Sequence, residues 1–161
     1  ESLQPDIPQL FRTAHSLGLS VSLDTNYDPA RRWDGGLDEA LQLADVFLPN
    51  ETEALAITHA PHLKAALAFL PENLCVAVKL GAQGALARCR GKMARVETFP
   101  IRVIDTTGAG DSFDAGFIFG YLAGWDLEKT LRLACACGAL STRASGGVAA
   151  QATLTEALEA R

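Results

Sequence analysis

The sequence has little positive charge and no long apolar run. Lys and Arg number 14 against 19 Asp and Glu, which gives a formal net charge of -5 at pH 7. Such a balance offers no basic surface for nucleic acid or for an anionic membrane, although a local positive site for a nucleotide stays possible. Nothing resembles a signal peptide or a membrane span. We therefore expect neither nucleic acid nor a membrane among the partners.

Cysteine is scarce and is not spaced for a zinc or redox site. Cys75, Cys89, Cys135 and Cys137 are scattered through apolar stretches, and one intervening residue between the last two is the wrong spacing for either site. We expect four buried thiols in a reducing compartment, which predicts a cytoplasmic location.

Two common phosphate-binding motifs are also missing. The sequence has no Gly-Lys-Ser/Thr for a P-loop, and Phe113 stands where a dinucleotide fingerprint needs its third glycine. An oxidoreductase would also need Gly-x-Gly-x-x-Gly after the first strand and an acidic residue beyond the second, and neither is present. These absences count against a P-loop enzyme and against a dinucleotide-dependent oxidoreductase.

An alternation of apolar strands and helices is what the sequence does contain. Its 161 residues are one domain's worth, and a hydrophobic content of 48% with 20% charged residues is globular. We expect an α/β fold with a doubly wound, largely parallel sheet and helices on both faces. The periodicity predicts helices over 7–17, 37–43, 63–70 and 127–144 and strands over 19–23, 45–48, 75–80, 85–90, 94–99 and 102–105, with further helices after 49–53, 111 and 156.

The clearest functional signal is the glycine-rich run from Asp105 to Asp111, between a strand end and a helix start. Backbone N–H groups at a helix start have no intrahelical partner and attract a phosphate oxygen, and Gly108 and Gly110 let the backbone approach it. Asp111 places a carboxylate at the lip of this anion site, which suits a base that accepts a proton from a hydroxyl. The alternative is that Asp111 only caps its helix and the glycines only make a tight turn.

The nine-residue run Asp-Thr-Thr-Gly-Ala-Gly-Asp-Ser-Phe, residues 105–113, resembles the second signature of the ribokinase-like (PfkB) carbohydrate kinases. The resemblance implies that Asp111 is the catalytic base and contacts the substrate. It also implies an anion hole for the transferred phosphoryl group, made by the N–H groups of Gly108, Ala109 and Gly110. It further implies a monovalent cation such as K⁺, held by Asp105, Thr107 and, from a later segment, Gly146.

Asp24 and Asn26 follow the first strand, where open α/β sheets bind ligands. They are equally ordinary turn formers before Pro29. The resemblance favours contact with the substrate, since many sugar kinases of the family carry Asp-x-Asn here with a Trp downstream, as Trp33 is in this sequence.

Asn50 and Glu53 lie one helical turn apart after the next strand. The spacing by itself favours a capping box with no chemistry in it. The resemblance implies instead that Glu53 orients Mg²⁺ through water and that Asn50 lies near the nucleotide phosphates.

Gly81 and Gly84 make a tight turn between strands, which indicates a hairpin first and a ligand site second. By resemblance they belong to the nucleotide loop. Lys79 stands where many relatives have Ser or Thr, and we expect its ammonium to reach the phosphates. His59 and His62 fit a solvated turn better than a metal site. The helix over 127–144 has a small face that suits either adenine or close packing, with Ala134, Ala136, Gly138 and Ala139.

By resemblance, residues 1–161 are the C-terminal nucleotide-binding and catalytic part of a ribokinase-like kinase, and its N-terminal part with the lid is missing. The implied activity is ATP-dependent transfer of the γ-phosphoryl group, with Mg²⁺, to a hydroxymethyl group of a sugar or nucleoside. The alternative is a nucleotide-binding fragment without turnover, because the half that closes on the sugar is absent. A homodimer is expected for the full-length parent.

Overall fold

The computed structural model describes residues 4–26 and 36–160, so Pro29 and Trp33 lie outside the described residues. The described residues form two compact units. One holds the residues up to Val78 together with Arg88–Lys92, and the other holds Lys79–Ala87 together with the residues from Met93 onward. The units are described separately below.

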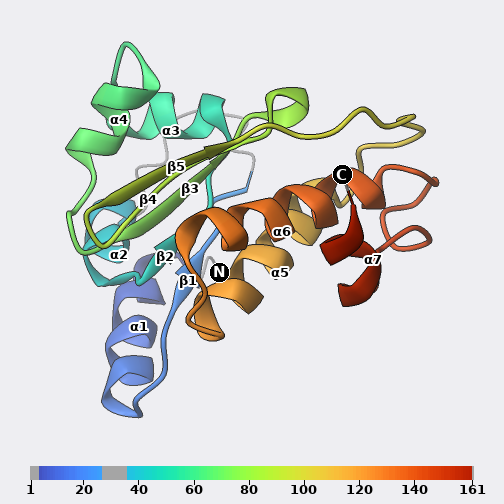
Figure 1. Cartoon of the computed structure of the whole chain (residues 1–161). Coiled ribbons are helices and arrows are strands. Elements are labelled where there is room, and N and C mark those ends of the chain that lie inside the picture. The colour runs from blue at the N-terminus through green and yellow to red at the C-terminus, as the bar shows by residue number, and fades with distance from the viewer. Residues whose placement is uncertain (1–3, 27–35, 161) are drawn as a thin grey trace. The chain divides into compact units, whose positions relative to one another are not determined.

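Helices and strands alternate along the chain, as the periodicity predicts (Figure 1). The elements are η1 (Gln4–Asp6), α1 (Ile7–Ser16), β1 (Ser22–Leu23), α2 (Leu37–Leu43), β2 (Val46–Phe47), α3 (Glu51–Thr58), α4 (Leu63–Phe69), β3 (Cys75–Lys79), η2 (Gly81–Gln83), β4 (Ala85–Cys89), β5 (Lys92–Val96), α5 (Ala109–Leu122), α6 (Leu127–Ser141) and α7 (Leu154–Glu159).

The five strands form one sheet in the order β1-β2-β3-β4-β5. β1 pairs with β2 and β2 pairs with β3 in parallel. Two residues, Arg90 and Gly91, connect β4 to β5, and both have positive φ, at 50° and 75°. Positive φ at both central residues is what a two-residue hairpin turn requires, so this pair is antiparallel and the sheet is mixed. The predicted α/β class with a largely parallel sheet is confirmed.

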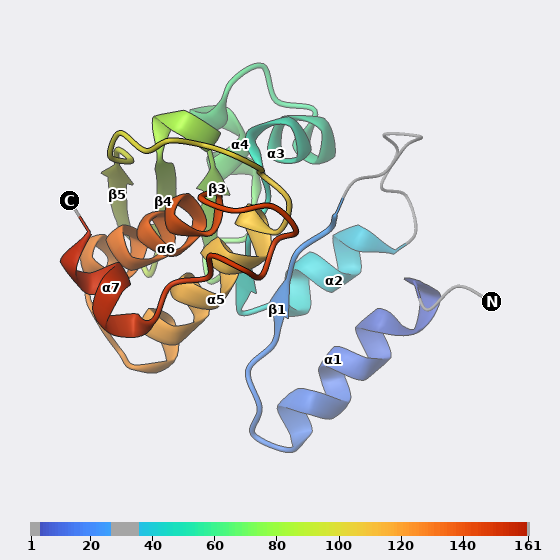
Figure 2. The ribbon, with the colours of Figure 1, turned by 90° about the vertical axis from the view of Figure 1, so that its right-hand side faces the viewer.

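The core of the first unit is built on β2 and β3. Phe47, Val76 and Val78 are fully buried, and Leu48 and Cys75 are at most 2% exposed. Parallel strands covered on both faces read as continuous apolar runs, which is how these two strands appear in the sequence. Beside them α1 and α2 lie side by side in both ribbon views and share an ion pair between Arg12 and Glu39 (Figures 1 and 2).

Local signals fix the helix ends in the first unit. Pro8 occupies the first turn of α1, where its missing N–H costs nothing, and Gly18 follows the helix with φ at 76°. His59 ends α3 in the left-handed region, and the Nδ1 atom of His62 accepts a hydrogen bond from the N–H of Ala65 at the start of α4. Both histidines therefore shape a turn, as the spacing indicates.

Arg88 on β4 closes the end of α4. Its guanidinium donates to the carbonyl oxygens of Leu67, Leu70, Pro71 and Leu74. The last carbonyls of a helix have no intrahelical donors, and a cation is favoured beside them. The sequence shows Arg88 only as a charge in a strand, so its role depends on a contact between segments far apart in the chain.

The cysteine prediction is wrong for one pair. Cys75 on β3 and Cys89 on β4 form a disulfide between neighbouring strands, because the strand order places them opposite each other. Cys135 is a buried free thiol, as expected, and Cys137 is a free thiol that is only half-buried. Burial raises the pKa of Cys135 to about 12, so this thiol stays protonated.

The second unit is organised around the close packing of α5 on α6, which lie side by side in both ribbon views (Figures 1 and 2). A Cβ atom on Gly116 would lie 2.9 Å from the Cα atom of Ala134, and one on Gly120 would lie 2.7 Å from the Oγ1 atom of Thr130. Two glycines four residues apart on α5 therefore allow the backbones to approach. Ala134 and Gly138 of α6 lie at this contact, which agrees with the packing alternative for these two residues.

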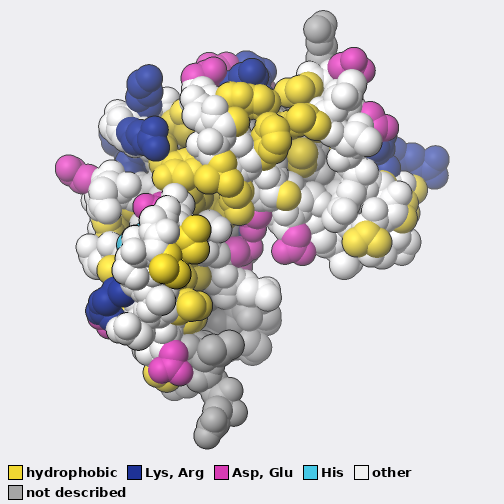
Figure 3. All heavy atoms as spheres, turned by 90° about the horizontal axis from the view of Figure 1, so that it is seen from below, with side chains coloured by type: hydrophobic (Ala, Val, Ile, Leu, Met, Phe, Trp, Pro, Cys, Tyr) yellow, Lys and Arg dark blue, Asp and Glu magenta, His cyan; other side chains and the backbone are white. Residues whose placement is uncertain are grey.

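A second face of α6 packs on α7. The buried residues of this cluster are Leu133, Ala136, Leu140 and Ala157. Thr153 and Glu156 form the predicted capping box of α7. Apolar side chains also reach the surface, as the face in Figure 3 shows. Several of them adjoin one another on that face, and apolar atoms contribute more than half of the surface of folded proteins. No helix of the described residues is long and apolar enough to cross a membrane.

Three boundaries in the second unit differ from the prediction. No strand forms over 102–105, because the N–H groups of Ile104 and Asp105 both donate to the carbonyl of Thr142 instead of to a neighbouring strand. β5 begins and ends earlier than 94–99. α6 stops at Ser141, where the hydroxyls of Ser141 and Thr142 donate back to carbonyls of the preceding turn.

We predict that Gly116→Val lowers the free energy of unfolding by about 1–3 kcal/mol, the usual range for overpacking. The added side chain would meet the α6 backbone, which cannot move away as a flexible side chain can. Ala115→Val on the exposed face of the same helix is the control, because it introduces the same residue type outside the contact. Urea unfolding measures both variants, and equal losses would contradict the packing role of Gly116.

Candidate active site

The first turn of α5 carries the predicted anion site. Gly108 precedes the helix with φ at 73°, which favours glycine. The N–H groups of Gly110 and Asp111 have no hydrogen-bond partner among the described residues. Ala109 differs from the prediction, since its N–H donates to the carbonyl of Thr106 at 3.1 Å. Among the described residues, the predicted donors Gly108 and Gly110 have no such bond, and the N–H group of Asp111 is a further candidate donor.

Asp111 lies exposed in this same turn. No side chain caps the start of α5, and Asp111 makes no hydrogen bond or ion pair with any described residue. The alternative that Asp111 merely caps its helix is therefore wrong for this structure. Its exposed carboxylate lies beside the free N–H groups of the helix start and is accessible to a hydroxyl group.

The Asp105 carboxylate holds the glycine turn at the start of α5 through hydrogen bonds. Its carboxylate accepts hydrogen bonds from the N–H groups of Thr107 and Gly146, both at 2.9 Å, and from the hydroxyl of Ser145 at 3.3 Å. The backbone bonds to Gly146 and Thr107 are the main reasons why the pKa of Asp105 lies well below its usual range. The structure thus brings together Asp105, Thr107 and Gly146, the three residues predicted to hold a monovalent cation.

The roles of these three residues differ in detail from the prediction. Gly146 contributes its N–H to Asp105, and its carbonyl accepts a hydrogen bond from Val148 at 3.0 Å. The oxygens of a carboxylate and of backbone carbonyls are the ligands that a hard cation prefers, and a carbonyl accepts more than one bond. Cation binding by this group stays a prediction. No cluster of three or more His, Cys, Asp or Glu side chains suited to a metal exists among the described residues.

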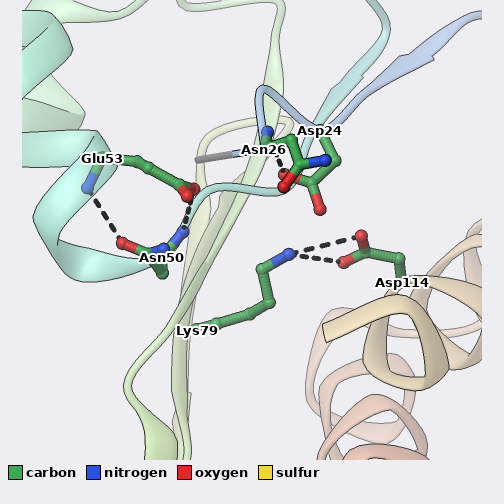
Figure 4. A network of polar contacts seen from close by, with 6 residues as sticks. All are labelled: Asp24, Asn26, Asn50, Glu53, Lys79 and Asp114. Atoms are coloured by element: carbon green, nitrogen blue, oxygen red, sulfur yellow. Dashed lines mark hydrogen bonds and ion pairs between the residues drawn. The ribbon is translucent and has the colours of Figure 1, made fainter. Parts of the chain in front are cut away.

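Lys79 lies beside the same helix turn and is paired with Asp114 (Figure 4). Its Nζ atom lies 3.1 Å from Oδ1 and 3.3 Å from Oδ2 of Asp114. A Cβ atom on Gly110 would lie 3.6 Å from this Nζ atom. The sequence reasoning missed Asp114. Its one signal was an acidic residue three positions after Asp111 on a helix face that is otherwise buried.

The glycine loop of the second unit has one strict position. Gly84 has φ at 83°, and a Cβ atom there would lie 1.9 Å from the carbonyl oxygen of Val96 on β5. Gly81 has φ at 58° with nothing within 4 Å of such an atom. Gly84 is thus required by the sheet, while Gly81 faces open space and is the one whose exposure suits a ligand. Nucleotide contact by either stays a prediction.

In the first unit, Asn50 and Glu53 form the capping box that their spacing indicates (Figure 4). The Asn50 side chain accepts from the Glu53 N–H, and Glu53 accepts from the Asn50 N–H, both at 2.9 Å. Glu53 is only 5% exposed. The capping role is confirmed, and the roles at Mg²⁺ and phosphate stay predictions.

Asp24 and Asn26 form a turn directly after β1. Asn26 has φ at 54°, and its N–H donates to Oδ1 of Asp24 at 3.2 Å (Figure 4). Asx side chains commonly make such turns, so the turn-forming alternative is realised. Asp24 and Asn50 both follow the carboxyl ends of the neighbouring parallel strands β1 and β2, the edge at which open α/β sheets bind ligands. Contact with a substrate stays a prediction.

Comparison with known proteins decides the family. The model of the pfkB family of carbohydrate kinases matches residues 4–154. The chain belongs to the pfkB family. The glycine turn at the start of α5 is thus the second signature of a pfkB kinase, and not a chance resemblance.

Relatives and solved structures agree with this membership. An ATP-dependent ribose-1-phosphate kinase of Halopiger xanaduensis is 37% identical over 147 residues, which are 90% of this chain and 48% of the relative. A putative ribokinase II from E. coli in complex with ATP and Mg²⁺ has a TM-score of 0.82 at 30% identity, covering 94% of this chain and 51% of that one. A fructokinase double mutant from Vibrio cholerae, bound to fructose, ADP and potassium ion, has a TM-score of 0.74 at 27% identity, covering 94% and 54%.

This pfkB chain spans about half the length of the curated relatives it matches. The family match runs from residue 4 to 154, so it contains every candidate residue discussed above. The fold and the family are thus established, while activity and substrate are matters for proposal.

The two loop glycines can be tested for which of them the fold requires. We predict that Gly84→Ala is strongly destabilising or prevents folding, because its side chain would overlap the β5 backbone. Gly81→Ala meets only the cost of its positive φ, on the order of 1 kcal/mol. The midpoint temperature of thermal unfolding should therefore be much higher for Gly81→Ala than for Gly84→Ala. Equal midpoints would contradict the backbone contact at Gly84.

Proposed function

We propose that this chain is the nucleotide-binding and catalytic half of an ATP-dependent carbohydrate kinase. The reaction is transfer of the γ-phosphoryl group to a hydroxymethyl group of a sugar or nucleoside. One observation carries the proposal: the unpaired N–H groups of Gly110 and Asp111 and the exposed Asp111 carboxylate share one helix turn. An anion-binding turn with its own base is the minimum that phosphoryl transfer to an alcohol requires.

The surroundings of Gly110 fit a bound phosphate group. Its φ is not positive, and the nearest atom to an added Cβ lies 3.6 Å away, which is ordinary contact. The fold therefore tolerates a side chain at this position, unlike at Gly84 or Gly116. Close approach of a ligand oxygen to the backbone explains why a glycine stands there.

The proposed mechanism assigns few groups. Asp111 accepts the proton of the acceptor hydroxyl while the new oxygen–phosphorus bond forms. The N–H groups of Gly110 and Asp111 donate to the phosphoryl oxygens, with Gly108 shaping the turn. Asp105 holds this turn in place through Thr107 and Gly146. Since phosphoryl transfer depends mainly on positioning and on charge stabilisation, so small a set is sufficient.

Metal ions have candidate ligands in both units. Glu53, with its buried carboxylate at the start of α3, has the oxygen ligands that Mg²⁺ prefers and would act through bound water, with Asn50 near the phosphates. Asp105, Thr107 and Gly146 would hold a monovalent cation such as K⁺. A divalent ion supplies neutralisation of phosphate charge when bound. The ATP, Mg²⁺ and potassium ligands of the similar structures support this assignment.

The competing proposal is a nucleotide-binding fragment without turnover, since the chain spans half of its relatives. The kinase proposal also includes binding of the sugar by Asp24 and Asn26. It further includes a homodimer of the full-length protein and a cytoplasmic location. The location rests only on the free thiols of Cys135 and Cys137, because Cys75 and Cys89 are paired.

We predict that Asp111→Asn lowers kcat by roughly 10²- to 10⁴-fold in the protein expressed from the complete reading frame, the usual range for a general base. Nucleotide affinity should stay nearly unchanged, because the backbone donors remain. Asp126→Asn, at the N-cap of α6, is the control, since Asn caps a helix as well as Asp does. Steady-state kinetics with an unchanged kcat for Asp111→Asn would remove Asp111 from the role of base.

We also predict that Glu53→Gln weakens the response to Mg²⁺ more than the binding of metal-free ATP. Gln serves a capping box as well as Glu does, so the stability of α3 should hardly change. The proposed contact to the water shell of the ion needs the carboxylate charge. A magnesium titration of kinase activity, combined with a thermal melt, separates the two roles. If the titration matches that of the unmodified protein, Glu53 is a helix cap only.

A further inference from the structure

The strongest feature that the proposed mechanism does not use is the ion pair between Lys79 and Asp114. Lys79 is the last residue of β3, and Asp114 lies in the second turn of α5. Both oxygens of Asp114 lie within hydrogen-bond distance of the Lys79 ammonium, at 3.1 and 3.3 Å. The two side chains are only 15% and 12% exposed. The pair is therefore shielded from water on most sides.

The ammonium lies directly beside the anion site. A Cβ atom on Gly110 would lie 3.6 Å from Nζ and 4.0 Å from Cδ of Lys79, so the lysine stem runs along the first turn of α5 (Figure 4). Asp111 lies one residue after Gly110, and Asp114 lies about one helical turn after Gly110. The positive charge of Lys79 thus lies beside a helix turn that offers unpaired N–H groups to an anion.

Stability is a poor explanation for this pair. Removing two charges from water is costly, and a shielded ion pair often stabilises a protein no more than apolar residues of the same size. A lysine side chain on its four-carbon stem is also flexible, so a fixed position needs an anchor. Asp114 provides that anchor on the rigid helix that carries the anion site, which suits placement of a charge.

We propose that Asp114 is a positioning residue that holds the Lys79 ammonium beside the first turn of α5, where it contacts the terminal phosphate of a bound nucleoside triphosphate. The inference rests on the proposed nucleotide site and adds to it the residue that orients its cation. The opposite role would be competition, in which Asp114 withdraws Lys79 from the phosphate. The two roles predict opposite effects of removing the Asp114 charge.

Binding measurements on a double-mutant cycle separate these roles. The variants are Lys79→Met, Asp114→Asn and the two together, with Lys79→Arg to retain the charge. Glu128→Gln is the matched control, because it removes a carboxylate from the exposed pair with Arg132 on α6. The ligands are a non-hydrolysable Mg–ATP analogue and AMP, and calorimetry on the protein from the complete reading frame gives each Kd.

For the ATP analogue, we expect Lys79→Met to weaken binding about tenfold or more, as loss of a charge-assisted hydrogen bond does. Asp114→Asn should weaken binding about three- to tenfold in the unmodified background, because the ammonium loses its anchor. In the Lys79→Met background the same change should strengthen binding, since it removes a negative charge near the phosphates. This reversal of sign identifies Asp114 as acting through Lys79.

AMP lacks the terminal phosphates, so its Kd should change less than about twofold in every variant. Glu128→Gln should leave the Kd of both ligands unchanged. Equal losses for the ATP analogue and AMP would indicate general destabilisation and would overturn the inference. Tighter binding by Asp114→Asn in the unmodified background would establish competition and would also overturn it.

Folding is the practical risk for Lys79→Met, because the shielded Asp114 carboxylate then loses the ammonium of its ion pair. The double variant has no such charge and keeps the cycle interpretable, and Lys79→Arg reports on charge without that risk. If the unmodified protein binds neither nucleotide, the proposed function fails. If it binds the analogue but the two changes add independently, only the role of Asp114 fails.

Discussion

The hydrogen bond from Gly146 to the carboxylate of Asp105 joins two loops that are 41 residues apart in the sequence, and the geometry of the active-site turn depends on it. The same carboxylate holds Thr107, and the backbones of Gly108 and Gly147 approach so closely that a Cβ on either would lie 3.1 Å from a carbonyl oxygen of the other loop. Segment 105–108 is therefore fixed from both sides. A helix that starts on a fixed turn presents its first N–H groups in a fixed direction, which is the preorganisation that electrostatic catalysis needs.

The glycines of the second unit show how packing and function can be told apart. Gly116 and Gly120 are needed because α6 touches α5, and Gly84 is needed because β5 passes beside it. Gly110 has neither reason: its φ is ordinary, and an added methyl group would make only normal contact. An unexplained glycine next to unpaired N–H groups points to a ligand, because the fold alone does not require it.

The sequence predicted the elements that carry strong local signals. The bounds of α2 match the prediction, and the capping boxes of α3 and α7 follow from residue types three apart. What failed depends on tertiary contacts. Segment 102–105 forms no strand because the N–H groups of Ile104 and Asp105 donate to the carbonyl oxygen of Thr142. Lys79 was identified without its partner, since nothing in a single sequence says that position 114 faces position 79.

The structural and functional explanations of one residue need not compete, and Glu53 shows why. The sequence presented its spacing from Asn50 as either a capping box or a metal motif, and the structure realises the capping box. A side chain fixed by its own helix start loses little further freedom on meeting an ion, so the cap lowers the entropic cost of binding. Capping by Glu53 and the metal binding proposed for it would thus use one orientation, and the first does not argue against the second.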